Sequence, residues 1–253
     1  MLRPLLLLAS LLLVGGSAAS AATPAKPRVV LSISVAGGFV PYEYAYGTIP
    51  ELVVYGDGTA ITPLVGGAAG LVLPRLRIVH LAPAQLTSLI AKARRAELLA
   101  GPIAYPMPQV TDLPTTTVTI VVNGHLHTHA AYALGFPEKS EHGVRKTLLR
   151  FVSATRSFVR AQGTVVRPRA LPTRVRLHAT TSQGGVTGTV EPWAVDGLGL
   201  ATIGECAVTS SPSVIRVLAQ LRRGARYREH GTTYELTMRA LLPGDPGCVP
   251  PSA

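Results

Sequence analysis

The chain has 253 residues, and its 24 lysines and arginines outnumber its 13 aspartates and glutamates, which leaves a formal net charge of +11. Hydrophobic residues make up 47% and charged residues 15%, a balance that argues against intrinsic disorder. Two cysteines are too few for a disulfide-rich scaffold or a four-cysteine zinc ribbon, and no apolar run long enough to span a bilayer follows the N-terminal segment.

The N-terminal segment predicts export. Arg3 precedes the apolar run Leu5–Val14, and the small residues Ala19–Ala21 follow. A basic start, a short apolar stretch and a small-x-small ending are typical of a signal peptide, so we expect residues 1–21 to be removed by cleavage before Ala22. A retained N-terminal anchor is the alternative. No cysteine lies directly after the apolar run, where a lipid would be attached. We therefore expect a secreted or extracytoplasmic protein without a lipid anchor.

The two cysteines, Cys206 and Cys248, are expected to form a disulfide. An oxidising compartment favours pairing, and an even number of cysteines in an exported chain is typical of a structural bridge. Closing the long loop between them would stabilise the fold by roughly 4 kcal/mol in the chain-entropy description. A nucleophilic cysteine is the alternative.

The segment from residue 28 to residue 134 predicts strands joined by tight turns. Apolar and β-branched stretches predict strands at Arg28–Val35, Glu51–Tyr55, Thr59–Thr62, Arg75–Leu81, Thr115–Val122 and His125–Leu134. The turn sequences Gly56-Asp57-Gly58 and Asn123-Gly124 indicate that two pairs of these strands are hairpins. The glycine-rich stretch Leu64–Leu73 is expected to be a packed loop.

Three helices are predicted between and after these strands. Pro83 opens the first, which Gly101-Pro102 ends before a proline-rich loop that runs to Pro114. The second covers Glu141–Ala161, and the third runs from Ser211-Pro212 to Leu221. The apolar stripe expected on the second helix consists of Val144, Leu148, Phe151, Val152, Thr155, Phe158 and Val159.

The remaining segments complete the predicted fold. Gly163–Thr173 contains two prolines and is predicted to be a linker, and Gln183–Gly188 is predicted to be a glycine-rich loop. Arg174–Ala179 predicts a strand, and residues 226–241 predict a last hairpin. The fold class is therefore α+β, with an antiparallel β-sheet built from hairpins and about three helices packed mainly on one face. Residues 22–165 and 166–253 are expected to form two α+β regions or one continuous domain.

Several short motifs, which are spread over most of the chain, carry a resemblance to other proteins. They are Gly37–Pro41, Tyr55–Thr59, Thr111–Thr116, His127–His129 with Ala131–Gly135, and Arg239–Asp245 with Cys248. Together they resemble a group of actinobacterial secreted proteins of unknown function. The resemblance implies an exported, envelope-associated protein, and it assigns no activity and no catalytic residue.

A histidine-rich strand is the first candidate for a functional site. His125, His127 and His129 alternate in the sequence HLHTH, and a strand places alternate side chains on one face. Neighbouring imidazoles on that face can share one Zn²⁺ or Cu²⁺ ion, for which His80 or His178 would supply a further ligand. The alternative is a polar hairpin face that binds no metal. The sequence identifies no cofactor.

A run of basic residues is the second candidate. Nine lysines and arginines and no acidic residue lie between Gly143 and Thr189. The arginines of this run that we expect to form an anion-binding surface are Arg145, Arg150, Arg156, Arg160, Arg167, Arg169, Arg174 and Arg176. Anionic envelope polymers or anionic lipid head groups are the expected partners, and export disfavours nucleic acid. A solvated surface without a partner is the alternative.

No catalytic signature is recognised. Asp57 and Asp112 are interpreted as turn and loop residues rather than as a catalytic pair. The sequence contains no Gly-x-Ser-x-Gly elbow, no His-Glu-x-x-His motif and no phosphate-cradling glycine loop. We therefore expect a non-enzymatic exported binding module with a basic face. A metal-binding protein or metalloenzyme built on the histidine strand is the alternative, and an inhibitor of a secreted hydrolase that uses loop 102–114 is a third hypothesis.

Overall fold

A computed structural model describes residues 28–64, 73–137, 141–182, 189–222 and 224–248. The predicted signal peptide, almost all of the 64–73 loop and the whole 183–188 loop lie outside these residues. Within the described part, twelve strands form two mostly antiparallel sheets, and five helices accompany them, which confirms the α+β fold class. The hairpins divide between two sheets, where the sequence predicted one. None of the described helices is long and apolar enough to cross a bilayer.

The larger sheet has seven antiparallel strands in the order β6-β5-β1-β2-β3-β4-β7. Their bounds are Val29–Ala36 (β1), Leu52–Tyr55 (β2), Thr59–Pro63 (β3), Leu76–His80 (β4), Thr115–Val122 (β5), His125–Tyr132 (β6) and Thr164–Ala170 (β7). Both predicted hairpins of this region are confirmed. Asn123 and Gly124 have φ angles of 50° and 81°, the positive values that a tight two-residue turn between β5 and β6 requires.

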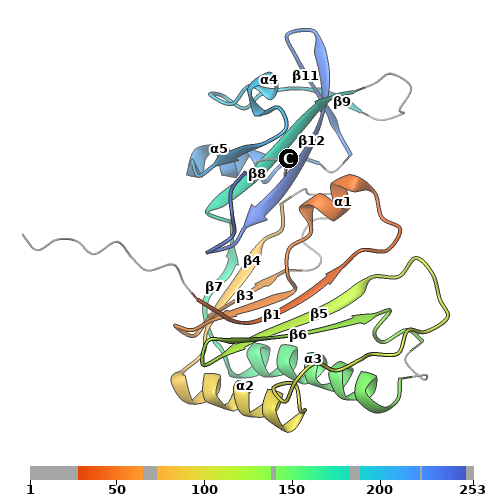
Figure 1. Cartoon of the computed structure of the whole chain (residues 1–253). Helices are drawn as coiled ribbons and strands as arrows, with labels where there is room; N and C mark the ends of the chain where they lie inside the picture. The colour runs from red at the N-terminus through yellow and green to blue at the C-terminus, as the bar shows by residue number, and fades with distance from the viewer. Residues whose placement is uncertain (1–27, 65–72, 138–140, 183–188, 223, 249–253) are drawn as a thin grey trace, which may run out of the picture.

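Two helices cover one face of the larger sheet. They are α2 (Pro83–Arg95) and α3 (Gly143–Gln162), both drawn below the sheet in Figure 1. Between the helices and the sheet lies a core that includes Leu31, Ile120 and Phe151. Pro83 occupies the first turn of α2, as its missing N–H favours.

The buried stripe of α3 differs from the prediction at its first turn. Leu148, Phe151 and Val159 are buried as expected, but Val144 is 41% exposed. Arg145 is buried in this turn, at 8% exposure. The hydrophobic period alone misses this residue, because the burial of an arginine depends on partners from other segments.

The predicted linker is in fact strand β7. It pairs antiparallel with β4 and forms one edge of the larger sheet, and residues 164–169 are all exposed. Pro168 is compatible with this position, because an edge strand need not donate an N–H on its outer side. The division expected between residues 165 and 166 therefore falls inside a strand, and the smaller sheet begins at Arg174.

The smaller sheet has the strand order β10-β8-β12-β11-β9, in which β9 and β11 are parallel and the other pairs are antiparallel. Its strands are β8 (Arg174–Thr181), β9 (Val190–Pro192), β10 (Ala207–Thr209), β11 (Arg226–Glu229) and β12 (Thr232–Leu241). The short helices α4 (Leu200–Ile203) and α5 (Pro212–Leu218) share its core with residues such as Leu177 and Tyr227. Ser211 accepts a hydrogen bond from the amide of Val214 and so caps α5.

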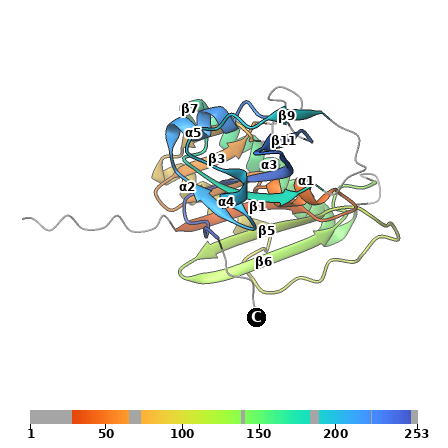
Figure 2. The ribbon, with the colours of Figure 1, turned by 90° about the horizontal axis from the view of Figure 1, so that it is seen from above.

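The two sheets meet on the face of the larger sheet that lies opposite α2 and α3. In Figure 2 the smaller sheet is seen in front of the larger one. Val53, Ile61 and Leu76 of the larger sheet pack there with Ala240 at the end of β12. The hydroxyl of Tyr55 donates to the backbone oxygen of Pro243 at 3.0 Å. The remaining helix, α1 (Tyr42–Gly47), also contacts β12.

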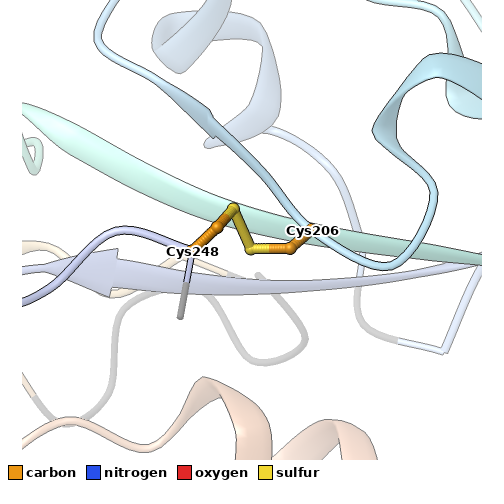
Figure 3. The surroundings of a disulfide bond; sticks show 2 residues. All are labelled: Cys206 and Cys248. Atoms are coloured by element: carbon orange, nitrogen blue, oxygen red, sulfur yellow. A yellow bond between two sulfur atoms is a disulfide. The ribbon is translucent and has the colours of Figure 1, made fainter. Parts of the chain in front are cut away.

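The expected disulfide joins Cys206 and Cys248, whose Cα atoms lie 5.7 Å apart (Figure 3). Cys206 directly precedes the edge strand β10, and Cys248 follows β12. The bond thus ties the end of the described chain to the edge of the smaller sheet. Neither cysteine is available as a nucleophile in this structure.

Candidate anion-binding surface

The three histidines of β6 do share one face, but their environments differ. His125 is exposed, His127 is half-buried and His129 is 1% exposed. The Nε2 atom of His129 lies 2.8 Å from the backbone oxygen of Leu98, and its Nδ1 atom lies 3.0 Å from the hydroxyl of Tyr105. A carbonyl oxygen can only accept, so Nε2 carries a proton and donates it to Leu98.

Both ring nitrogens of His129 are therefore engaged with the protein. Burial raises the pKa of Tyr105 to about 12, which keeps its hydroxyl protonated as a donor to Nδ1. His178 lies in the smaller sheet, where its ring packs against those of Tyr42 and Tyr46. The described residues contain no group of three or more histidine, cysteine, aspartate or glutamate side chains placed to hold a metal ion.

Arg145 does not lie on the expected anion-binding surface, because it is buried and all five of its N–H donors are used. Nε and Nη2 donate to the two carboxylate oxygens of Glu141 at 2.8 and 2.7 Å. Nη1 donates to the backbone oxygens of Pro106 and Tyr132, and Nη2 also donates to that of Ala133. The side chain joins α3 to the proline-rich loop and to the end of β6.

Glu141 completes this buried ion pair. Burial acts to raise the pKa of its carboxyl, but hydrogen bonds from Arg145 and from the amide of Gly135 outweigh burial and hold the pKa below its usual value. The carboxylate is therefore charged at neutral pH and balances Arg145. This pair is part of the fold and has no donor left for a ligand.

The other arginines of the predicted surface are divided between the two sheets. In the smaller sheet, Arg174 donates to the backbone oxygen of Asp245, and the guanidinium of Arg176 lies 4.8 Å from the centre of the Tyr46 ring. Arg150 is exposed on α3. The remaining members, Arg156, Arg160, Arg167 and Arg169, come from the C-terminal half of α3 and from β7.

Of these, Arg167 and Arg169 lie on the edge strand of the larger sheet, and Arg156 and Arg160 lie on the part of α3 that leads into that strand. Arg167 and Arg169 are exposed on β7, and Arg167 pairs with Ile78 of β4. Arg77, the neighbour of Ile78, lines a cleft of about 440 Å³ together with Arg156 and Arg160 of α3. We call Arg77, Arg160, Arg167 and Arg169 the basic edge.

Sequence reasoning missed two residues of this region, Arg77 and Glu51. Glu51 precedes β2, lines the same cleft and forms an ion pair with Arg156. The alternation of basic and apolar residues in Arg75–Leu81 was a signal that Arg77 projects from a strand. Nothing in the sequence places that strand beside α3, because the contact depends on the order of strands in the sheet.

Asp57 and Asp112 lie in a turn and a loop, respectively. Asp57 stabilises the β2–β3 turn, where its carboxylate accepts from the amide of Thr59 at 2.8 Å and from its hydroxyl at 3.0 Å. Asp112 adopts a positive φ of 61°, and its backbone oxygen accepts from the amide of Phe39. Asp57 therefore serves its turn, as interpreted from the sequence, whereas Asp112 contributes to its loop through its backbone.

A second cleft, of about 430 Å³, lies in the smaller sheet between residues 193–199 and residues 228–230. Its Glu229 accepts from the amide of Leu200 at 2.7 Å and so supports the start of α4. The Trp193 side chain donates to the backbone oxygen of Leu198 at 2.6 Å. These two side chains thus hold the loop of this cleft in place.

Comparison with known proteins finds no matching family model, no matching curated protein and no matching solved structure.

Proposed function

We propose that this chain is an exported, non-enzymatic binding module that holds an anionic polymer of the cell envelope on its basic edge. The observation that carries the proposal is the exposure of Arg167 and Arg169 on the edge strand β7, next to β4 and the end of α3, which place Arg77 and Arg160 on the adjoining cleft. The N-terminal sequence, with its apolar run and small residues, supports export.

The positive charge of the basic edge is not balanced by nearby carboxylates in the part of the chain that the structure describes. Strand β7 contains no acidic residue, and α3 contains none either. Among the described residues, no carboxylate forms an ion pair with any of the four arginines of the basic edge. Uncompensated cations that lie on one edge raise the local potential and attract a chain of negative charges. A linear polymer can run along an edge strand and contact several guanidinium groups in succession.

Retention on immobilised polyphosphate tests this proposal. The protein without residues 1–21 is expected to bind at low salt and to elute as the salt concentration rises towards 0.2 M, because the screening length falls to about 10 Å at 0.1 M. Replacing Arg167 and Arg169 together by glutamine should weaken binding at least tenfold. Salt-independent retention, or no retention at low salt, would overturn the proposal.

The matched control replaces two exposed arginines away from this edge. Arg94 and Arg95 lie on α2, and their replacement by glutamine removes the same charge as the β7 variant. This control is expected to bind polyphosphate within twofold of the wild type. Equal weakening by both variants would show that net charge, and not the basic edge, is responsible. Preferential binding to vesicles of anionic lipid would assign the edge to a lipid surface instead.

A further inference from the structure

The cleft beside the basic edge is built by α3 and the face of the larger sheet. Arg156 and Arg160 are one helical turn apart and therefore lie on the same side of α3. Arg77 faces them from β4, and Thr62 of β3 lines the cleft as well. Val79 and Val159, both buried, line its apolar wall. The volume of about 440 Å³ falls in the range of small-molecule sites, roughly 300–1,000 Å³.

A close contact holds the end of α3 against β4. Gly163, which follows α3, has no Cβ, and a Cβ at this position would lie 2.7 Å from Cγ2 of Val79 and 2.8 Å from the backbone oxygen of Val159. The helix therefore ends directly beside the strand that carries Arg77. This approach brings Arg160 and Arg77 to the same cleft.

The charges that line the cleft do not cancel. Glu51 pairs with Arg156, and no described carboxylate pairs with Arg77 or Arg160. The cleft thus has three guanidinium groups against one carboxylate, a balance of two positive charges. In addition, the Nε atom of Arg156 is buried and has no hydrogen-bond partner among the described residues.

The side chain of Arg156 is partly buried, with 39% of its surface exposed. Removal from water disfavours its charged form and lowers the pKa of its guanidinium. A bound anion would relieve this cost, because a guanidinium fork donates two parallel hydrogen bonds to adjacent oxygens of one phosphate or carboxylate group. A buried donor without a partner and two unpaired cations are what a site for an anion requires.

We propose that this cleft, the arginine cleft (Arg77, Arg156 and Arg160), binds a phosphate monoester dianion. The balance of two positive charges matches a monoester, whose charge at neutral pH is about −1.5 to −2. A phosphate diester carries one charge and an ester group on each side, so it suits the open edge better than the cleft. The hydroxyl of Thr62 can donate to a phosphate oxygen. This inference rests on the proposed function. It gives the basic edge a specific subsite, which would bind the phosphorylated ends of the polymer or free monoesters.

Calorimetric titration with two small ligands tests the proposal directly. Methyl phosphate is a monoester dianion, and dimethyl phosphate is the corresponding diester with one charge. We expect methyl phosphate to bind the protein without residues 1–21 at one site and at least tenfold more tightly than dimethyl phosphate. Because the second pKa of a monoester is about 6, its binding should also weaken as the pH falls from 7 to 5. Equal binding of the two ligands, or no binding of methyl phosphate, would overturn the proposal.

Arginine variants locate the site. Arg77→Gln and Arg160→Gln should each weaken methyl phosphate binding at least tenfold, and Arg94→Gln with Arg95→Gln should leave it within twofold. Circular dichroism and the unfolding midpoint verify that each variant is folded. If Arg77→Gln does not fold, Arg160→Gln decides, because the side chain of Arg160 is exposed and forms no hydrogen bond or ion pair with the other described residues. Unchanged affinity in a folded Arg160→Gln variant would place any phosphate site elsewhere.

The results also separate this inference from the proposed function. Retention on polyphosphate that depends on Arg167 and Arg169, without binding of methyl phosphate, would sustain the polymer-binding module and refute the monoester site. Saturable binding of methyl phosphate that Arg160→Gln abolishes, without retention on polyphosphate, would sustain the arginine cleft and refute the polymer as its source. A third outcome would connect the polymer-binding module with the monoester site. In that outcome, a polymer that ends in a phosphate monoester binds the protein, and removal of the terminal phosphate weakens its binding.

Discussion

Individual residues of this protein have different roles from those that their spacing predicts. Arg145 belongs to the basic run, yet all five of its N–H donors form hydrogen bonds inside the protein, to Glu141 and to three backbone oxygens. His129 belongs to the HLHTH strand, yet both of its ring nitrogens have protein partners. In both cases the sequence identifies a side chain that could bind a ligand. In the folded protein, segments distant in sequence help to bury that side chain, and all of its hydrogen-bond partners lie within the protein.

Glu141→Gln should show how much the buried ion pair contributes to stability. The variant leaves Arg145 without its counter-charge, so we expect a loss of about 3–5 kcal/mol in the free energy of unfolding at pH 7. The folded-state pKa of Glu141 is depressed, so its contribution is fully present above the unfolded pKa of about 4.3 and disappears as the pH falls through the lower folded value. The difference between the wild type and the variant should therefore shrink at acid pH.

Urea unfolding followed by circular dichroism at pH 7, 5 and 3 measures this difference. Glu43→Gln is the matched control, because Glu43 is exposed on α1 and its replacement should change stability by no more than about 0.5 kcal/mol. A gap between wild type and Glu141→Gln that stays constant down to pH 3 would contradict the assigned role of the carboxylate.

His129→Ala should be far more destabilising than His127→Ala. The first change leaves the buried oxygen of Leu98 and the hydroxyl of Tyr105 without a partner, and each unsatisfied group costs about 1–3 kcal/mol. His127 is half-buried on the same strand, so its variant is the natural comparison. Unfolding midpoints of the two variants in urea check the prediction, and equal losses would show that the His129 hydrogen bonds do not matter.

At the scale of elements, local turn chemistry predicted the hairpins well. Asn123-Gly124 and Gly56-Asp57-Gly58 specify short connections whose strands then pair in the only register that the turn allows. Strand β7 escaped prediction because Pro168 and Pro172 are typical of a linker, and only the edge position in the sheet makes such a strand acceptable. The three-residue strands β9 and β10 have too little pattern to be recognised.

The candidate site also includes residues that the sequence alone could not bring together, because they are far apart in the chain. The arginines of α3 and β7 are close in sequence and were predicted together, whereas Arg77 and Glu51 come from strands that the sheet order alone brings to α3. Sequence periodicity identifies which way a side chain points on its own element, and it contains no information about the element across the cleft. The sign of the charge was therefore predictable, and the cleft was not.

Gly163→Ala should loosen the contact between α3 and β4. The added methyl group would meet Val79 and the backbone oxygen of Val159 at distances that force a shift, which costs about 1–3 kcal/mol. Gly56→Ala is the matched control, because a Cβ there would meet its nearest neighbour at 3.6 Å, an ordinary contact distance. Thermal unfolding of both variants measures the difference. A Gly163→Ala variant as stable as the Gly56→Ala variant would show that the helix end moves freely.

At the scale of the whole molecule, the larger sheet is covered on both faces. Helices α2 and α3 bury one face, and the smaller sheet contributes Ala240 and Leu242 to the core on the other. This arrangement explains why so few charged residues suffice for a chain of this size, since the central strands need apolar side chains on both sides. It also leaves the sheet edges as the places where polar function can lie, and β7 with its arginines is one of them.

The disulfide is expected to matter most for the smaller sheet. Replacing Cys206 and Cys248 together by serine removes the link between β10 and the segment after β12, and we expect a loss of roughly 4 kcal/mol in the free energy of unfolding. The single tryptophan of the chain, Trp193, packs against Tyr227 of this sheet, so its fluorescence reports the transition. Reduction of the wild type is the control for the effect of the serines, and it should lower the urea midpoint by the same amount. A reduced protein that unfolds at the midpoint of the oxidised one would show that the short edge strand β10 is held by its pairing with β8 alone.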